Sequence, residues 1–182
     1  MGKHKDFQTG IIAVLVIAVL FMTVGFAAYS SLLNINGTVK VSGNKWSVHF
    51  VPNSYVETTG SVEATDVSLD ETTMTYKVNL DKIGDSYEFD IDVTNDGTLD
   101  AKLVQVAMGG LDSDQKKYIQ HVVTYDGVSY EATTSNLNNL IAADATKKVH
   151  VKVTYIQPEV PSDLPENDVN LTLTVALNYQ QV

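Results

Sequence analysis

The chain has 182 residues, 44% of them hydrophobic, and this length favours one domain of ordinary size. It carries 22 acidic residues against 12 basic ones, all lysines, for a formal charge of −10. This balance argues against nucleic acid as a partner, because phosphate binding needs a basic face. Cysteine is absent, which excludes disulfides, thiolate metal sites and thiol catalysis.

The first 33 residues have the composition of a targeting segment. Lys3, His4 and Lys5 form a short basic start, and residues 7–33 contain no charged side chain. The most apolar stretch is residues 11–26. Its length lies between a signal-peptide core of about 7–15 residues and a membrane-spanning helix of about 20. The flanking residues must therefore distinguish the two.

The residues after this stretch favour cleavage by a signal peptidase, which needs small side chains at positions −3 and −1. Gly25 and Ala27 supply them for a cut before Ala28, and residues 28–30 offer a second, weaker site. We therefore expect residues 1–27 to be a signal peptide, or a membrane anchor if they are retained.

Two alternatives stay open for this segment. An uncleaved segment would hold the protein in a membrane through residues 10–33. A pilin-type N terminus would instead be processed after Gly10, leaving a hydrophobic helix from Ile11 to pack in a filament core. The bacterial version of that helix has glutamate at its fifth position, which is Leu15 here.

Beyond the leader the apolar residues recur with a period of two, which is typical of strands with one buried face. In residues 28–36, Tyr29, Leu33 and Ile35 fall on one face. Further on, the alternating apolar positions are 39 and 41; 46, 48 and 50; 74, 76, 78 and 80; 87, 89, 91 and 93; 149, 151, 153 and 155; and 171, 173, 175, 177 and 179. Residues 99–108 are apolar on both faces and predict a central strand.

Turn residues separate these segments. Residues 95–97 (Asn-Asp-Gly) and 126–127 (Asp-Gly) tolerate the positive φ of tight hairpins. Residues 136–143 could form a short helix capped by Ser135, and Pro158, Pro161 and Pro165 mark one exposed loop. The pattern predicts an all-β fold, an antiparallel β-sandwich of jelly-roll type over residues 37–182, preceded by an N-terminal hydrophobic helix.

The sequence predicts no enzyme, no cofactor and no metal site. His4, His49, His121 and His150 are scattered and form no metal-binding motif. Residues 112–114 (Asp-Ser-Asp) could begin a calcium loop but lack its glycine and distal glutamate, so a solvated turn is expected.

Two further features have structural interpretations. Asp90 and Asp92 share a strand face, where acids favour edge protection or solubility over catalysis. Trp46, the only tryptophan, lies on the apolar positions of its segment and is expected in the core.

Two stretches of the chain resemble the TasA/camelysin family of Gram-positive bacteria, whose members are exported through a signal peptidase of the SipW type. One is GFAAYSSLLNINGTVKVSG, in which Phe26-Ala27-Ala28-Tyr29 is similar to the family's leader junction. The other is residues 78–106, which carries the family's Leu-x-x-x-Gly-Asp-x-x-x-Phe…Asn-x-Gly-x-Leu pattern at Leu80, Gly84, Asp85, Phe89, Asn95, Gly97 and Leu99. The closing VNLTLTVALNY is similar to the family's last strand, and the match covers about half of the chain.

The resemblance implies a secreted matrix or surface protein that assembles into fibres, in which the freed N-terminal segment is inserted as a strand into the next subunit. Tyr29, Leu33 and Ile35 would then fill a pocket in that neighbour. Camelysin members carry a peptidase label, but no zinc motif here supports one.

The leading hypothesis is therefore a secreted, structural β-sandwich subunit of a cell-surface fibre or biofilm matrix. Its partners would be copies of itself and related matrix proteins. The alternatives are a membrane-anchored surface module that binds a sugar or protein, and a pilin-like filament subunit.

Overall fold

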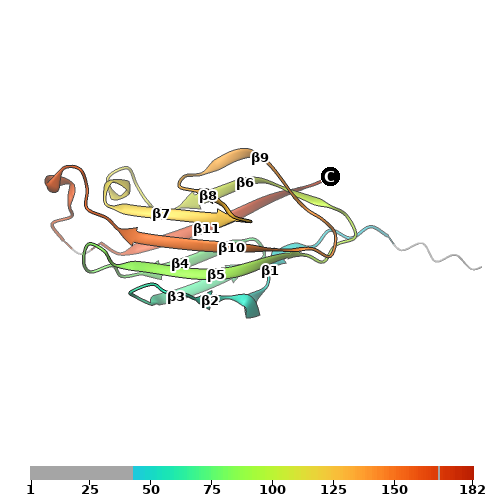
Figure 1. Cartoon of the computed structure of the whole chain (residues 1–182), viewed down its shortest axis with the longest axis horizontal. Coiled ribbons are helices and arrows are strands. Elements are labelled where there is room, and N and C mark those ends of the chain that lie inside the picture. Colours follow the sequence, from blue (N-terminus) through green and yellow to red (C-terminus); the bar gives the residue numbers. More distant parts are fainter. Residues whose placement is uncertain (1–42, 168) are drawn as a thin grey trace, which may run out of the picture. The chain divides into compact units, whose positions relative to one another are not determined.

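The computed structural model describes residues 43–167 and 169–182, which belong to one compact unit beginning at Gly43. This unit is all-β, as the sequence predicts, and its strands form two antiparallel sheets (Figure 1). The first sheet contains β1 (Val48–Phe50), β2 (Val56–Glu57), β5 (Ser86–Asn95), β7 (Ile119–Tyr125), β8 (Val128–Tyr130) and β10 (Thr146–Tyr155). The second contains β3 (Ala64–Asp70), β4 (Thr73–Val78), β6 (Ala101–Gly109), β9 (Thr134–Ile141) and β11 (Leu171–Gln181).

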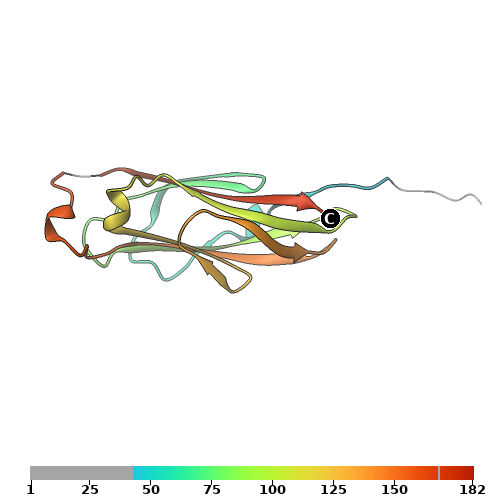
Figure 2. The same cartoon turned by 90° about the horizontal axis from the view of Figure 1, so that it is seen from above.

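The strand order is β1-β5-β10-β7-β8 in the first sheet, with β2 also paired to β5, and β3-β4-β11-β6-β9 in the second. Among the described strands, only β3–β4 and β7–β8 are hairpins within one sheet. From β4 to β7, and from β8 to β11, each connection crosses to the other sheet, so loops at both ends join the two layers (Figure 2). The signals of period two arise because each layer has one face on this shared core.

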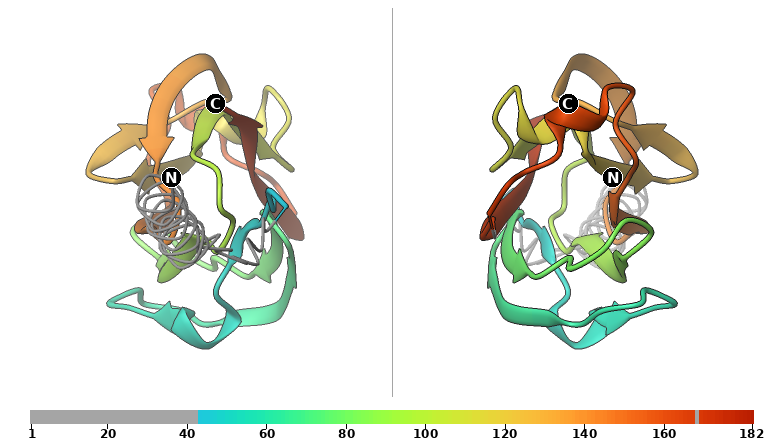
Figure 3. Two further views of the ribbon diagram at one scale, coloured as in Figure 1. Left: turned by 90° about the vertical axis from the view of Figure 1, so that its right-hand side faces the viewer. Right: turned by 90° about the vertical axis from the view of Figure 1, so that its left-hand side faces the viewer.

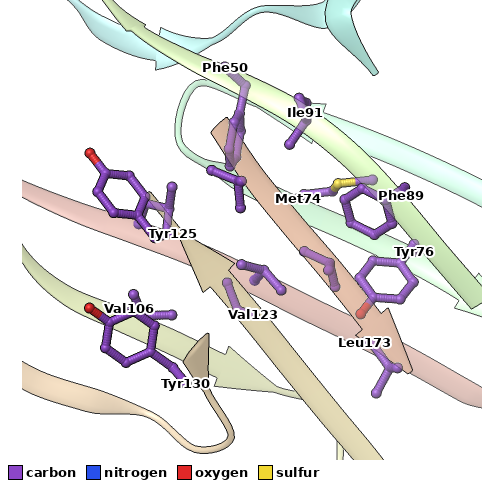
Figure 4. Close-up of a cluster of buried hydrophobic side chains, with 14 of the residues drawn as sticks. Phe50, Met74, Tyr76, Phe89, Ile91, Val106, Val123, Tyr125, Tyr130 and Leu173 are labelled. Carbon is purple, nitrogen blue, oxygen red and sulfur yellow. The ribbon is translucent and has the colours of Figure 1, made fainter. Parts of the chain in front are cut away.

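The core lies between the sheets and is rich in aromatic side chains (Figure 4). Tyr76 of β4 meets Tyr87 and Phe89 of β5, with ring centroids 5.5 and 5.3 Å apart. All three side chains are buried. Such inter-sheet contacts hold the layers in one register, because a shift by one residue would turn every aromatic ring outward.

The strands define two ends of the sandwich, seen along its long axis in Figure 3. At the proximal end the described chain begins: the Lys45 N–H donates to Thr98 Oγ1 and the Thr98 N–H to the Lys45 carbonyl, both at 2.9 Å. The C terminus lies there too, since Gln181 pairs with Ala101. At the distal end lie the start of β7 and the loops that follow β4, β6 and β10. The ten residues of β10 separate the two ends by roughly 33 Å.

Some local expectations are wrong. Residues 136–143 are not helical but belong largely to β9, where tertiary pairing with β6 overrides helix propensity. Trp46 is 43% exposed, because the chain before β1 is held by residues 96–98 and not by the sheet. Pro158 is buried, so the loop that contains it is only partly exposed.

Other expectations are confirmed. Asp126 and Gly127 form the tight β7–β8 turn with φ of 49° and 82°. β6 lies inside its sheet, between β11 and β9. The Asp112 carboxylate accepts the Asp114 and Gln115 N–H groups at 2.9 and 2.8 Å, which makes a solvated turn.

Phe89 provides a test of the core. Phe89→Ala should lower the free energy of unfolding by about 3–5 kcal/mol, because it removes a fully buried ring and leaves a cavity. Val56→Ala, at a side chain that is 57% exposed, is the control and should change it by under about 0.5 kcal/mol. Equal effects of the two variants in urea unfolding would contradict this packing.

Candidate strand-acceptor groove

Strand β7 is paired along its whole length on one side but only in part on the other. On the first side β10 pairs with β7 from Ile119 to Tyr125. On the second side β8 pairs only with residues 123–125, after which the chain leaves for the other sheet. Residues 119–122 of β7 are therefore an open sheet edge at the distal end.

The hairpin turn fixes which backbone groups face this opening. Tyr125 and Val128 flank the two-residue turn, so the N–H and C=O groups of Tyr125 point toward β8. Backbone groups alternate in direction along an antiparallel strand, so those of His121 and Ile119 point the same way. Beyond the end of β8 these four groups have no strand opposite them.

A hollow of about 470 Å³ lies beside this open edge. Five of its lining side chains are apolar: Met108, Leu111, Ile119, Ala132 and Ile156. Lys116, Gln120 and Glu131 add polar groups, and Gly109, His121 and residues 131–133 complete the lining. We call this hollow, with the edge of residues 119–122, the acceptor groove.

On the opposite wall of the acceptor groove, the backbone groups of Met108 on β6 already have a hydrogen-bond partner. Pairing of β9 with β6 ends at Thr134 and Val106. Past that point Thr133 Oγ1 accepts the Met108 N–H at 2.9 Å and donates to the Met108 carbonyl at 3.1 Å. One hydroxyl thus takes the place of a strand along β6, and the unpaired backbone is left on the β7 side.

His121 ties the floor of the groove to the other sheet. Its side chain is buried, and its Nε2 lies 2.7 Å from the hydroxyl of Tyr76 on β4. Burial lowers the pKa of His121 to about 4 and raises that of Tyr76. Both groups are therefore neutral near pH 7, and they act as a hydrogen-bonded link between the sheets.

The outer strands of both sheets carry features that discourage further pairing. β1 and β2 are separated by a turn at Pro52, and β8 has three residues. β3 has a register shift between Ala64 and Asp66, and β9 has one beside Asn136, whose φ is 61°. The edge of residues 119–122 carries no comparable interruption.

Two residues of the family pattern hold the proximal end. Asn95 is fully buried, and its Nδ2 donates to the carbonyls of Leu99, Ile141 and Ala142 at 2.8, 3.2 and 3.2 Å. Its Oδ1 accepts the Gly97 N–H at 3.1 Å. The expected hairpin at residues 95–97 is wrong: the chain here crosses between sheets.

Glycine is needed at position 97 for space and not for a positive φ. A Cβ there would lie 2.5 Å from the Lys45 carbonyl oxygen.

Three more residues of the pattern lie between β4 and β5 or in the core. The Asp85 carboxylate, which is buried, accepts the Asp81 and Lys82 N–H groups, both at 3.1 Å. Gly84 has φ of 97°, which favours glycine, and its N–H donates to the Tyr155 carbonyl at 2.8 Å. Phe89 is in the core. The pattern therefore marks structural positions at both ends, separate from the acceptor groove.

Asp90 and Asp92 belong to a charge ladder on the outer face of the first sheet. β5 is an inner strand, so the interpretation as edge protection is wrong. Lys148, His150 and Lys152 of β10 stand opposite Asp92, Asp90 and Glu88. The Lys152–Glu88 and His150–Asp90 contacts are both 2.7 Å. Cross-strand pairs of this kind contribute roughly 0.2–1 kcal/mol each.

The proposed processing and donor residues lie outside the described residues. These are Gly25, Ala27, Ala28, Tyr29, Leu33 and Ile35. Within residues 43–167 and 169–182, no group of three or more His, Asp or Glu side chains is placed to hold a metal ion. The described part of the chain also has no helix of the length and hydrophobicity that crossing a bilayer requires.

Comparison of the chain with protein-family models, curated proteins and solved structures gives no match. The geometry of the acceptor groove is therefore the main evidence on which a function can be argued.

The Asn95 contacts give one prediction. Asn95→Ala should lower the free energy of unfolding by about 3 kcal/mol, because it leaves buried carbonyl groups without donors. Asn178→Ala is the matched control: Asn178 bonds Gln105 on the exposed face and should cost under about 0.5 kcal/mol. If chemical denaturation gives similar losses for both, Asn95 does not hold the proximal end.

The pKa of His121 gives a second prediction, on the pH dependence of stability. The folded pKa, about 4, lies below the ordinary value of 6.5, so the unfolded chain takes up this proton first as pH falls. The free energy of unfolding is therefore unaffected by this proton above pH 6.5. It falls as the pH is lowered toward 4, by about 3 kcal/mol in total.

Stability curves of wild type and His121→Gln should therefore converge as pH falls from 6.5 to 4. An NMR titration of the wild-type His121 ring, which needs no variant, should have its midpoint near 4. Parallel stability curves together with a midpoint near 6.5 would contradict the buried, neutral imidazole.

Proposed function

We propose that the protein is a secreted structural subunit of an extracellular surface fibre or biofilm matrix. In this proposal its N-terminal segment, residues 28–36, adds a strand to β7 of a neighbouring copy. The observation that carries the proposal is the open edge of residues 119–122 beside a hollow lined by both apolar and polar side chains. Strand addition at such an edge pairs the exposed backbone groups, and side chains in the hollow supply specificity.

The start of the described chain and the acceptor groove lie at opposite ends of the sandwich, which favours a linear polymer. The described chain begins at the proximal end, and the acceptor groove lies at the distal end. A segment that leaves one end of a subunit and binds the other end of the next makes a heterologous contact. Such contacts repeat without closing unless the geometry forms a ring.

The chemistry of the segment suits the groove. Alternate side chains of an added strand point into the hollow, and Tyr29, Leu33 and Ile35 are apolar at alternating positions. Each buried Leu or Ile would contribute roughly 1.5–3 kcal/mol. The groove-facing N–H and C=O groups of Ile119 and His121 would add hydrogen bonds.

The resemblance to the TasA/camelysin family supports the same proposal, including export, cleavage before Ala28 and a cell-surface location. Partners would be copies of this chain and related matrix proteins with the same open edge. The jelly-roll assignment belongs to this proposal as well. What supports it is the pair of antiparallel sheets joined by crossing connections.

A second function uses the same groove differently. If residues 1–27 are retained, the protein would be a membrane-anchored module whose groove binds an extended peptide of another protein. The polar residues Lys116 and Glu131 at the groove would then help to select that peptide.

The proposal predicts that assembly depends on both the donor segment of one copy and the acceptor groove of the next. The chain beginning at Ala28 should form concentration-dependent polymers in analytical ultracentrifugation. Ala132→Arg, which places a charged side chain in the groove from an exposed position, should raise the concentration needed for assembly at least tenfold. Leu33→Asp should act similarly from the donor side. Ser68→Arg, on the exposed part of β3, is the matched control and should leave assembly unchanged.

A chain from Ala28 that stays monomeric at millimolar concentration would contradict the proposal. Protein from the native host should also have a mass that corresponds to a start at Ala28. An intact N terminus on a monomeric protein would favour the anchored module.

A further inference from the structure

Exposed hydrophobic side chains are concentrated at the two ends of the sandwich. Among the described residues seven large apolar side chains are exposed. Four lie at or next to the proximal end: Trp46, Val128, Leu140 and Val182. Two, Ile83 and Val160, lie in loops of the distal end, and only Val56, paired to the middle of β5, lies on a side. Surfaces of this kind mark contacts with other proteins when they gather in one place.

Trp46 is the largest of these side chains, with 43% of its surface exposed. It borders a hollow of about 380 Å³ whose other lining residues include Val48, Phe50 and Pro52. Its backbone is held, because the neighbouring Lys45 and Ser47 bond to Thr98 and Asp96. Trp46 is thus a half-exposed indole on a segment whose backbone is held, next to a hollow with an apolar lining, and tryptophan is among the residues enriched in the hot spots of protein interfaces.

The distal end offers a matching surface in the loop after β10. Val160 is 51% exposed and is followed by the exposed Pro161. The loop is held in place, since Pro158 is buried, the Asp163 N–H donates to the Val160 carbonyl at 2.9 Å, and Lys117 bonds the Asp163 carboxylate at 3.2 Å. A loop that is already ordered loses little entropy on binding.

The length of the chain allows these two surfaces to meet, and Ile156, at the start of the Val160 loop, also lines the acceptor groove. Residue 36 ends the proposed donor segment, and Trp46 follows it by ten residues. Ten residues span at most about 35 Å, so Trp46 of the donor copy must lie within that distance of the acceptor groove of its neighbour. The groove is at the distal end, where the Val160 loop also lies.

We propose that Trp46 packs on the loop of residues 156–165 of the next copy, so that proximal and distal ends stack in the polymer. This inference rests on the proposed strand addition and names a second, separate contact of the same two copies. Strand addition supplies the tether, and the Trp46 contact sets the orientation of one subunit on the next. Val and Pro side chains are suitable partners for an indole face, because both are apolar and rigid.

The single tryptophan makes the contact directly measurable. In the chain beginning at Ala28, assembly should shift the fluorescence maximum to shorter wavelength and reduce acrylamide quenching severalfold. Trp46→Ala should raise the concentration needed for assembly at least tenfold, as expected for truncation of an interface anchor. Its thermal unfolding as a monomer should be close to wild type, because half of the side chain is in solvent.

Val160→Ser tests the other side of the contact. In polymers of this variant the Trp46 fluorescence should return toward that of the monomer, which separates contact with the loop from burial by any other segment. Val56→Ala, an exposed apolar residue on the side of the sandwich, is the control and should change neither assembly nor fluorescence.

The outcomes separate this inference from the proposed function. If polymers form, but Trp46 stays as accessible to quencher as in the monomer and Trp46→Ala assembles normally, the end-stacking contact is overturned while strand addition stands. If fluorescence shifts equally in wild type and Val160→Ser, Trp46 is buried elsewhere and the named partner is wrong. If wild type does not assemble at all, both proposals fail.

Discussion

The fold depends on how the backbone of β7 is paired. Its inward side chains, Ile119, His121, Val123 and Tyr125, are all buried, so the whole strand is needed in the core. Its neighbour β8 covers only residues 123–125 before the chain crosses to the second sheet. Buried strands with unpaired N–H and C=O groups are costly unless water or another strand pairs them. The first half of β7 therefore combines core side chains with an open backbone edge, and this combination is the basis of the proposed assembly.

The other edges of the described structure are partly protected against further pairing, although β3 is an outer strand with continuous register from Asp66 to Asp70. Thr133 closes the facing part of β6, and the outer strands are short, bulged or interrupted. The buried Asn95 and Asp85 hold the connections at the proximal and distal ends. The His121–Tyr76 bond fixes the groove floor to the second sheet. These polar contacts keep the two ends different in shape and chemistry, which a head-to-tail polymer requires.

Much of the fold could be predicted from alternation of apolar residues. The strands that begin or end near residues 48, 74, 87, 149 and 171 were found in this way, since each has a continuous inward row. The alternation does not predict β7, because a histidine interrupts its otherwise apolar inward row. That histidine is tolerated inside only because Tyr76, 45 residues earlier, supplies a hydrogen-bond partner from the other sheet. Residues 136–143, with Ser135 as a possible cap, are consistent with a short helix in sequence, but pairing with β6 makes most of them part of β9.

The acceptor groove itself could not be predicted, because it depends on where β8 ends relative to β7 and on the crossing that follows. The sequence pattern did locate Asn95, Gly97, Gly84 and Asp85. It could not reveal that Gly97 is required for close approach to Lys45, a contact between segments about 50 residues apart. Trp46 was placed wrongly for a related reason: alternation continues past the start of β1, whereas the hydrogen bonds that define the strand do not.

Amide hydrogen exchange at β7 tests the central claim most directly. In the chain beginning at Ala28, the N–H groups of Ile119 and His121 should exchange freely in the monomer and become at least about 100-fold slower in the polymer. The Gln120 N–H, which already points toward β10, should be protected in both states and serves as the internal control. If the Ile119 and His121 amides exchange equally fast in monomer and polymer, no strand is added at this edge and the account of assembly is wrong.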